Sequence, residues 1–216
     1  MTGICGSGII EAIAEMYLAG IIDSNGVVQG NLADRSKRII EDGRTFSYVI
    51  QETAPRVVIT QNDVRAIQLA KAALYAGIRL LMDRLGLEEV DTIRLAGAFG
   101  SHVDVKYAMV LGMIPDCDLS QVTSAGNAAG TGARIALLDR NSRSEIRRVV
   151  RNIEKVETAV EPSFQNYFVE AMAIPHKSAK FHNLSKVVDL PKAIAPSSKQ
   201  SGQRRRKRRV TQRKGL

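Results

Sequence analysis

Two short glycine-bearing segments are the parts of this sequence best suited to hold a ligand. They are Gly97-Ala98-Phe99-Gly100 and, 29 residues later, the segment that starts at Gly126-Asn127. Each follows a short run typical of a strand and precedes a helical pattern. Glycine lets the backbone approach a ligand closely, and open α/β sheets bind ligands at the carboxyl ends of their strands. We therefore expect the two corners to line adjacent edges of one crevice.

The same glycines also have a purely structural interpretation. They serve tight strand-to-helix turns, and the small residues between positions 125 and 133 would let a helix pack closely against a neighbour. Neither segment is a Walker A loop, because no GK[ST] is present, and neither is a GxGxxG dinucleotide fingerprint. Ligand binding and simple turn formation both remain open at this point.

Histidine and aspartate supply little further chemistry. His102, His176 and His182 lack HxxxH or HxH spacing, so we expect no metal site. Asp104 could bind a ribose or a magnesium-bound water near the first corner. An aspartate just before a helical pattern at 105–111 is, however, typical of a helix N-cap, and we expect that role.

The two cysteines, Cys5 and Cys117, exclude several kinds of centre. They are too few for a disulfide framework or for the four thiolates of a structural zinc or iron–sulfur cluster. Cys5 precedes a helical pattern, which could lower the pKa of its thiol. We expect instead a small buried cysteine in a packed glycine loop.

The elements that must position these residues alternate between helical periods and short β-branched runs. The clearest helix starts at Thr60, where the spacing to Asp63 resembles a capping box, and ends at Leu85-Gly86. Its expected apolar face consists of Ile67, Ala70, Leu74, Ile78 and Leu81, and its expected solvated faces carry Arg65, Gln68, Lys71 and Arg79.

The other elements support an α/β fold in one domain. We expect a first helix after the GICGSG loop that ends near Ala19-Gly20, and further helices over 105–111 and up to 138. Strands are expected at 27–28, 45–50, 57–59, 92–96 and 121–124, whereas residues 32–45 read as irregular.

The net charge of +9 is concentrated at one end of the chain. Residues 177–216 hold 13 basic residues and one acidic residue, whereas residues 1–176 hold 18 basic and 21 acidic residues. We expect residues 185–216 to form a basic tail that is mostly disordered, from about Ala195 onward. Its run Arg204–Arg209 could bind nucleic acid or an acidic protein surface by charge attraction, or could be a solvated extension with no partner.

Five segments in order resemble a known family over about residues 3–184. They read GICGSGIIEAIAEMYLAGIID, ITQNDVRAIQLAKAALYAGI, IRLAGAFGSHVDVKYAMVLGMIPD, SAGNAAGTGARIALL and FQNYFVEAMAIPH. The series is similar to the C-terminal part of the ATP-dependent reductive activators of corrinoid-dependent methyltransferases. Those proteins belong to the superfamily of acetate and sugar kinases, heat-shock chaperones and actin.

The resemblance implies a ribonuclease-H-like subdomain of an actin-like ATPase over residues 1–184, which would bind ATP with magnesium. The cofactor-binding positions that it implies are Gly97, Ala98, Phe99, Gly100, Gln68, Lys71, Gly126 and Asn127. The loop 97–100 would contact the adenosine, the helix with Gln68 and Lys71 would frame the adenine and ribose, and 126–127 would close the cleft. Ala98 stands where the superfamily often has a second glycine. The larger alanine side chain would narrow the room for the nucleotide.

Two parts of full-length activators have no counterpart in this sequence. These are the ferredoxin-like domain whose cysteines hold a two-iron two-sulfur cluster, and the acidic phosphate loops of the first nucleotide subdomain. The resemblance therefore implies an iron–sulfur cluster only in that other part. The sequence is then expected to be either a fragment of a longer protein or a stand-alone chain that works with a separately encoded iron–sulfur half. The main-chain amides of the GICGSG loop could still help to bind an anion.

The function expected from the sequence is the nucleotide-binding half of an activator that returns inactive cob(II)alamin to cob(I)alamin. Its partner would be a corrinoid protein or a corrinoid-dependent methyltransferase. The alternative is a non-catalytic interaction module whose basic tail binds nucleic acid or an acidic partner. No run of about 18 apolar residues and no basic leader is present, so we expect no membrane segment and a cytoplasmic protein.

Overall fold

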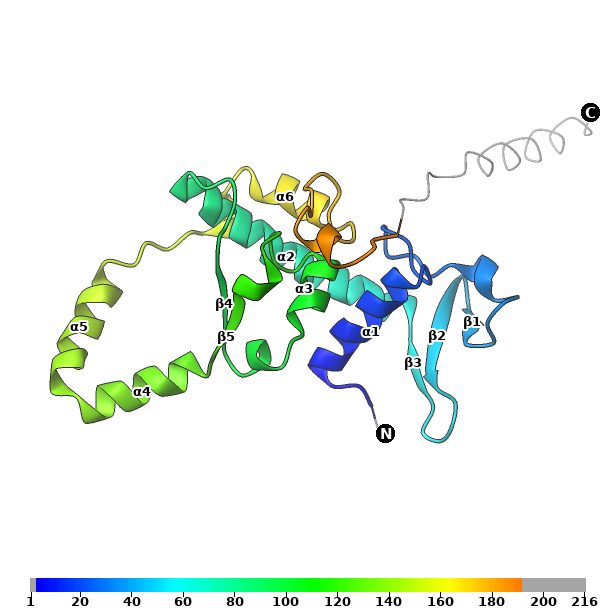
Figure 1. Cartoon of the computed structure of the whole chain (residues 1–216), viewed down its shortest axis with the longest axis horizontal. Helices are drawn as coiled ribbons and strands as arrows, with labels where there is room; N and C mark the ends of the chain where they lie inside the picture. Colours follow the sequence, from blue (N-terminus) through cyan, green and yellow to red (C-terminus); the bar gives the residue numbers. More distant parts are fainter. Residues whose placement is uncertain (1–2, 192–216) are drawn as a thin grey trace, which may run out of the picture.

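The structure is a computed structural model that describes residues 3–191. Residues 192–216 of the basic tail predicted to be mostly disordered lie outside the described residues. The helices are α1 (Gly6–Leu18), α2 (Gln61–Leu85), α3 (Val105–Leu111), α4 (Ala128–Leu138), α5 (Arg140–Arg151) and α6 (Phe164–Ala171). The strands are β1 (Ile39–Asp42), β2 (Thr45–Gln51), β3 (Val57–Ile59), β4 (Ile93–Ala96) and β5 (Val122–Gly126). Figure 1 shows α2 running through the body while α4 and α5 extend away from it.

The strands form two separate sheets. β1, β2 and β3 make an antiparallel meander, and its first turn passes through Gly43 at φ +62°. β4 and β5 pair in parallel, with Ile93 opposite Val122 and Leu95 opposite Ser124. A parallel pair needs a crossover connection, and here α3 lies within it. The expected α/β alternation is confirmed.

Local capping signals fix both ends of α2 and the start of α3 as the sequence predicts. Thr60 accepts a hydrogen bond from the Asp63 amide, and the Asp63 carboxylate accepts one from the Thr60 amide, which completes the capping box of α2. The helix ends at Gly86, whose φ of +67° is the left-handed conformation that favours glycine. Asp104 accepts hydrogen bonds from the amides of Lys106 and Tyr107, so its predicted role as N-cap of α3 is confirmed.

Three predictions about element boundaries are wrong. The first helix starts at Gly6, inside the glycine loop, because the thiol of Cys5 caps it. Residues 39–42, predicted to be irregular, form β1. The strand predicted at 27–28 is reduced to one isolated bridge between Val28 and Ile22.

The prediction of which face of α2 is buried is also wrong. Leu74 and Leu81 of the predicted apolar face are 46% and 52% exposed. The buried side contains Val64, Gln68, Lys71, Ala72, Tyr75, Ala76, Leu80 and Met82. Tertiary partners that offer main-chain carbonyls to a glutamine and a lysine decide the orientation of α2, and its pattern of apolar residues does not reveal them.

The core joins the N-terminal helix to the C-terminal segment. Ile13 of α1, Met109 of α3 and Leu184 are fully buried in one cluster with the inner side of α2. Val188 and Leu190 pack against the same cluster, so the chain still contacts the body beyond residue 184. The division into a domain 1–184 and a basic tail 185–216 stays a prediction.

Lys71 is the most unusual member of this core because it is charged in water and only 1% exposed here. Its ammonium group donates to the carbonyls of Ala173 and Pro175, the latter at 2.7 Å. Burial lowers the pKa of Lys71 to about 7, since desolvation disfavours the charged form. Two main-chain carbonyls therefore hold this amine in the fold.

Gln68, one turn before Lys71, also binds main-chain carbonyls of distant segments. Its amide nitrogen donates to the carbonyls of Asn25 at 2.9 Å and Met172 at 2.8 Å. The two side chains together join α2 to the turn after α1 and to the segment 172–175 that follows α6. We call this set of bonds the α2 clasp.

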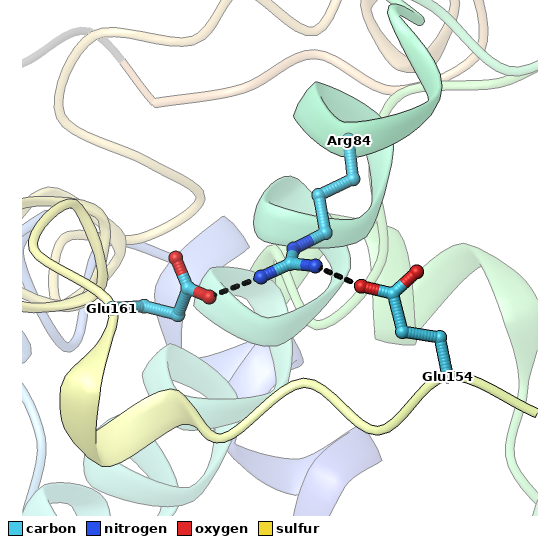
Figure 2. Close-up of polar contacts among 3 residues, drawn as sticks. All are labelled: Arg84, Glu154 and Glu161. Atoms are coloured by element: carbon cyan, nitrogen blue, oxygen red, sulfur yellow. Dashed lines mark hydrogen bonds and ion pairs between the residues drawn. The ribbon is translucent and has the colours of Figure 1, made fainter.

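Two ion pairs of Arg84 hold the chain where it returns to the body after α4 and α5. Figure 2 shows the guanidinium of Arg84 between the carboxylates of Glu154 and Glu161, with N···O distances of 2.5 Å to each. These ion pairs raise the pKa of Arg84, the hydrogen bond to Glu161 most. Because Arg84 and Glu154 are substantially exposed, the pairs position the returning chain more than they stabilise the fold.

The burial of Lys71 predicts a pH-dependent stability. An unfolded lysine keeps its proton up to about pH 10.5, whereas the folded one loses it above about pH 7, so the unfolded state binds more protons between these values. The free energy of unfolding should therefore rise with pH from 7 to 9.5, by at most about 1.4 kcal/mol per pH unit. Urea titrations at several pH values would measure this slope.

Lys71→Met should flatten the slope, and Lys177→Met, at an exposed lysine, should leave it unchanged. A slope that survives in Lys71→Met would show that another group causes it.

Candidate functional site

The two glycine corners meet at one edge of the β4–β5 pair. The amide of Gly97 donates to the carbonyl of Gly126 at 2.8 Å, immediately beyond the carboxyl ends of the two parallel strands. The prediction that the corners are adjacent is confirmed. Segments 29 residues apart thus form one ledge of exposed and half-buried backbone.

The first corner depends on Gly97. Its φ of +102° is strained for a residue with a side chain, and a Cβ built there would meet nothing within 4 Å. The chain then enters a single 3₁₀ turn over Phe99–Ser101, with Ala98 as its N-cap. Gly97 is therefore required by backbone conformation and leaves open space in front of the main chain.

Two serine hydroxyls connect the corners, and the sequence analysis did not identify them. Ser101 donates its hydroxyl to the carbonyl of Gly97 at 3.0 Å, and the hydroxyl of Ser124 lies 3.3 Å from that of Ser101. The only sequence signal was a serine directly after the GAFG segment and another near the end of β5. These bonds hold the 3₁₀ turn of the first corner against the second strand.

The start of α1 adjoins the first corner. A Cβ on Gly6 would lie 2.9 Å from the ring of Phe99, so the glycine lets the two segments touch. The Phe99 ring is still 52% exposed. The GICGSG loop and the GAFG loop, far apart in sequence, therefore belong to one neighbourhood.

The second corner leads directly into α4. Gly126 has a φ of +62°, and the side chain of Asn127 accepts a hydrogen bond from the Gly130 amide at 2.9 Å as the N-cap. The amides of Ala128 and Ala129 lie in the first turn of α4, at the positive end of the helix dipole. None of the residues of α4 is buried, so the small residues between 125 and 133 do not form a buried helix contact within residues 3–191.

Gln68 and Lys71 lie in the core, away from the two corners. The resemblance placed them beside adenine and ribose, but their side chains donate to main-chain carbonyls in the α2 clasp and are 2% and 1% exposed. The structure thus brings together Gly97, Ala98, Phe99, Gly100, Gly126 and Asn127, and it leaves Gln68 and Lys71 inside the core.

A separate hollow lies near the amino ends of β4 and β5. It has a volume of about 450 Å³ and is lined by Tyr75, Arg79, Met82, Glu88, Glu89, Val90, Pro115, Asp116, Ser178, Ala179, Lys180, His182 and Asn183. The glycine corners, at the carboxyl ends of the same strands, are an open ledge outside this hollow. Within residues 3–191, no group of three or more His, Cys, Asp or Glu side chains could hold a metal ion.

The expectation that Cys5 is buried is wrong. Cys5 is exposed, and its thiol lies 3.5 Å from the Ser7 hydroxyl and accepts a hydrogen bond from the Gly8 amide as the N-cap of α1. The hydroxyl of Ser7 first, and the amide of Gly8 second, lower the pKa of the Cys5 thiol. Cys117 is buried, and desolvation raises the pKa of its thiol.

Comparisons with known proteins agree with this architecture. The family described as the C-terminal domain of RACo, the ASKHA domain, matches residues 1–185. The corrinoid activation enzyme RamQ of Eubacterium limosum is 36% identical over 183 residues, which cover 79% of this chain and 31% of RamQ. A solved reductive activator for corrinoid, iron–sulfur protein superposes with a TM-score of 0.72 at 33% identity, over 81% of this chain and 29% of that one.

The fold and the two corners therefore define an ASKHA domain, the domain class of the actin-like ATPases. The chain belongs to the family of RACo C-terminal domains, as its resemblance to the reductive activators predicted. It spans less than a third of the length of RamQ and of the solved activator. Within residues 3–191, no helix is both long and apolar enough to cross a membrane.

The surroundings of Cys5 predict selective thiol reactivity. Because the thiolate is the nucleophile, iodoacetamide should modify Cys5 with a pH midpoint below 9.0 and should modify Cys117 only after unfolding. Ser7→Ala should raise the midpoint, since it removes the largest contribution, and Ser120→Ala should not. An unchanged midpoint in Ser7→Ala would contradict this assignment.

Proposed function

We propose that this chain forms the nucleotide-binding part of an ATP-dependent reductive activator, which returns cob(II)alamin to cob(I)alamin on a corrinoid protein or a corrinoid-dependent methyltransferase. The observation that carries the proposal is the hydrogen bond between Gly97 and Gly126, which joins the two corners at one sheet edge in a chain of the RACo family. The names of RamQ and of the solved activator supply the corrinoid chemistry.

The corners fit a ligand that lies against main chain. At both Gly97 and Gly126 the space where a Cβ would stand is empty for 4 Å, so a flat group could approach the backbone. Phe99 offers an exposed ring beside that backbone. We propose that this loop takes the adenosine, and that the first-turn amides of α4 next to Asn127 attract the negative charge of the phosphates.

Magnesium and the reacting phosphate need residues that the corners lack. The carboxylate nearest in sequence to the first corner is that of Asp104. It already accepts a hydrogen bond from the Lys106 amide as the N-cap of α3. Phosphoryl transfer requires charged groups around the γ-phosphate. The two corners offer main-chain amides and glycines in their place. ATP, once bound, would supply the free energy for an unfavourable electron transfer, and we propose that the rest of an activator supplies the magnesium ligands and the iron–sulfur cluster.

Nucleotide affinity should depend on Gly97. Gly97→Val places a side chain in the open space of the corner and opposes the φ of +102°, so binding of ATP should weaken by roughly tenfold or more. Calorimetry on the full chain with ATP at up to millimolar concentration would measure it.

Gly20→Val is the matched control, because Gly20 also has a positive φ, +70°, and also has nothing within 4 Å of a built Cβ. An equal loss in both variants would point to general destabilisation. No binding to the unmodified chain would contradict nucleotide binding and favour an interaction module.

The electron-transfer part of the proposal gives a second test. Two cysteines, one buried and one exposed, cannot hold a cysteine-ligated cluster, so anaerobic reconstitution with iron and sulfide should yield no visible absorption of a two-iron two-sulfur centre. Cob(I)alamin should form only when the missing part of an activator is added. Stoichiometric iron and sulfide in the isolated chain would contradict the proposal that another part of an activator holds the cluster.

A further inference from the structure

Helix α5 carries an apolar stripe that nothing in the described chain covers. Ile146, Val149 and Val150 follow the i, i+3, i+4 spacing of one face of α5 and are 39%, 51% and 60% exposed. Ile153, two residues beyond the end of the helix, is 66% exposed and extends the stripe. Such a stripe normally stabilises a helix by packing, and a short isolated helix is marginal in water. The stripe therefore indicates a surface that is buried in another assembly state.

The stripe lies on an arm whose two ends are fixed. Residues 127–153, here called the α4–α5 arm, leave the body directly after β5, and the chain returns at Glu154 and Glu161 to Arg84 (Figures 1 and 2). α4 adds Leu137 and Leu138, which are 73% and 81% exposed. Because both ends are anchored, the arm is a closed excursion from the body that exposes its apolar side chains.

The β4–β5 pair from which the arm starts is itself incomplete. Parallel sheets are normally buried on both faces and contain more strands, but Arg94, Ala96, Thr123 and Ser124 are exposed here. The open sheet leads through α4 to the helix that carries the uncovered stripe. One occupant could cover both.

The charge around the stripe narrows the choice of occupant. α5 contains five arginines and one glutamate, and its neighbour across the connection, Asp139, is used as its N-cap. A second copy of α5 would bring arginines against arginines. A polypeptide surface with an apolar patch and a rim of carboxylates matches both features.

We propose that the α4–α5 arm is the docking surface for the remaining polypeptide of a reductive activator, which presents an apolar patch rimmed by carboxylates to the stripe of α5. The proposal rests on the proposed function only in that the occupant is the rest of an activator. Relatives support this occupant, since RamQ and the solved activator are each more than three times as long as their matched part. It needs no nucleotide, so it stands or falls separately.

The test measures whether the stripe is covered. In a Cys5→Ser background, Val149→Cys places a thiol on the stripe, and Val169→Cys on α6 is a matched control because the two valines are 51% and 52% exposed. The rate of modification by N-ethylmaleimide is compared between this full chain alone and a chimera in which it replaces the matching segment of RamQ. Circular dichroism checks that each variant is folded.

In the chimera, we expect at least a tenfold slower reaction for Val149→Cys than in the isolated chain, and a clearly smaller change for Val169→Cys. Charge reversal by Arg147→Glu with Arg151→Glu should restore labelling of Val149→Cys in the chimera, because it opposes the carboxylate rim.

Equal rates in chain and chimera, or equal slowing at both positions, would overturn the proposal. So would slowing in the isolated chain that grows with its concentration, which assigns the stripe to a second copy. Protection of the isolated chain by anionic phosphatidylserine vesicles without protection in the chimera would assign it to a membrane surface, and would overturn the proposal equally.

Discussion

The fold depends on the requirement that buried main-chain carbonyls find donors. The segment 172–175 lies against α2, and two polar side chains of that helix, Gln68 and Lys71, satisfy its carbonyls. A buried lysine costs free energy while it is charged, and the lowered pKa of about 7 reduces that cost near neutral pH. A tight contact at Gly112 follows from the clasp, since a Cβ there would lie 2.0 Å from the Pro175 carbonyl oxygen.

This constraint also shapes the candidate site. Because the clasp takes Gln68 and Lys71 into the core, these two side chains are not available to a ligand at the sheet edge. What remains at the sheet edge is backbone, held by the Gly97–Gly126 bond and by Ser101. A site made of amides and open glycines offers backbone donors and open space to a ligand, but no charged side chain.

The sequence predicted features that depend on neighbours in the chain and missed those that depend on distant ones. The capping box at Thr60, the cap at Asp104 and the adjacency of the two corners follow from residue types within a few positions or from sheet topology. The buried face of α2 could not be predicted, because the carbonyls that bind Lys71 lie 102 and 104 residues away. Only the resemblance of whole segments, independent of such contacts, identified the family.

The open corner leads directly into the uncovered arm. β5 ends at Gly126, Asn127 caps α4, and α5 follows α4 after one residue, so the corner and the stripe belong to one continuous run of strand and helices. A polypeptide that fixes the arm would reduce the freedom of the α4 amides, and a nucleotide that orders those amides would reduce the freedom of the arm. Linkage requires that each event strengthen the other by the same factor. Under the two proposals made above, docking on the arm and binding of a nucleotide at the ledge would therefore be two sides of one equilibrium.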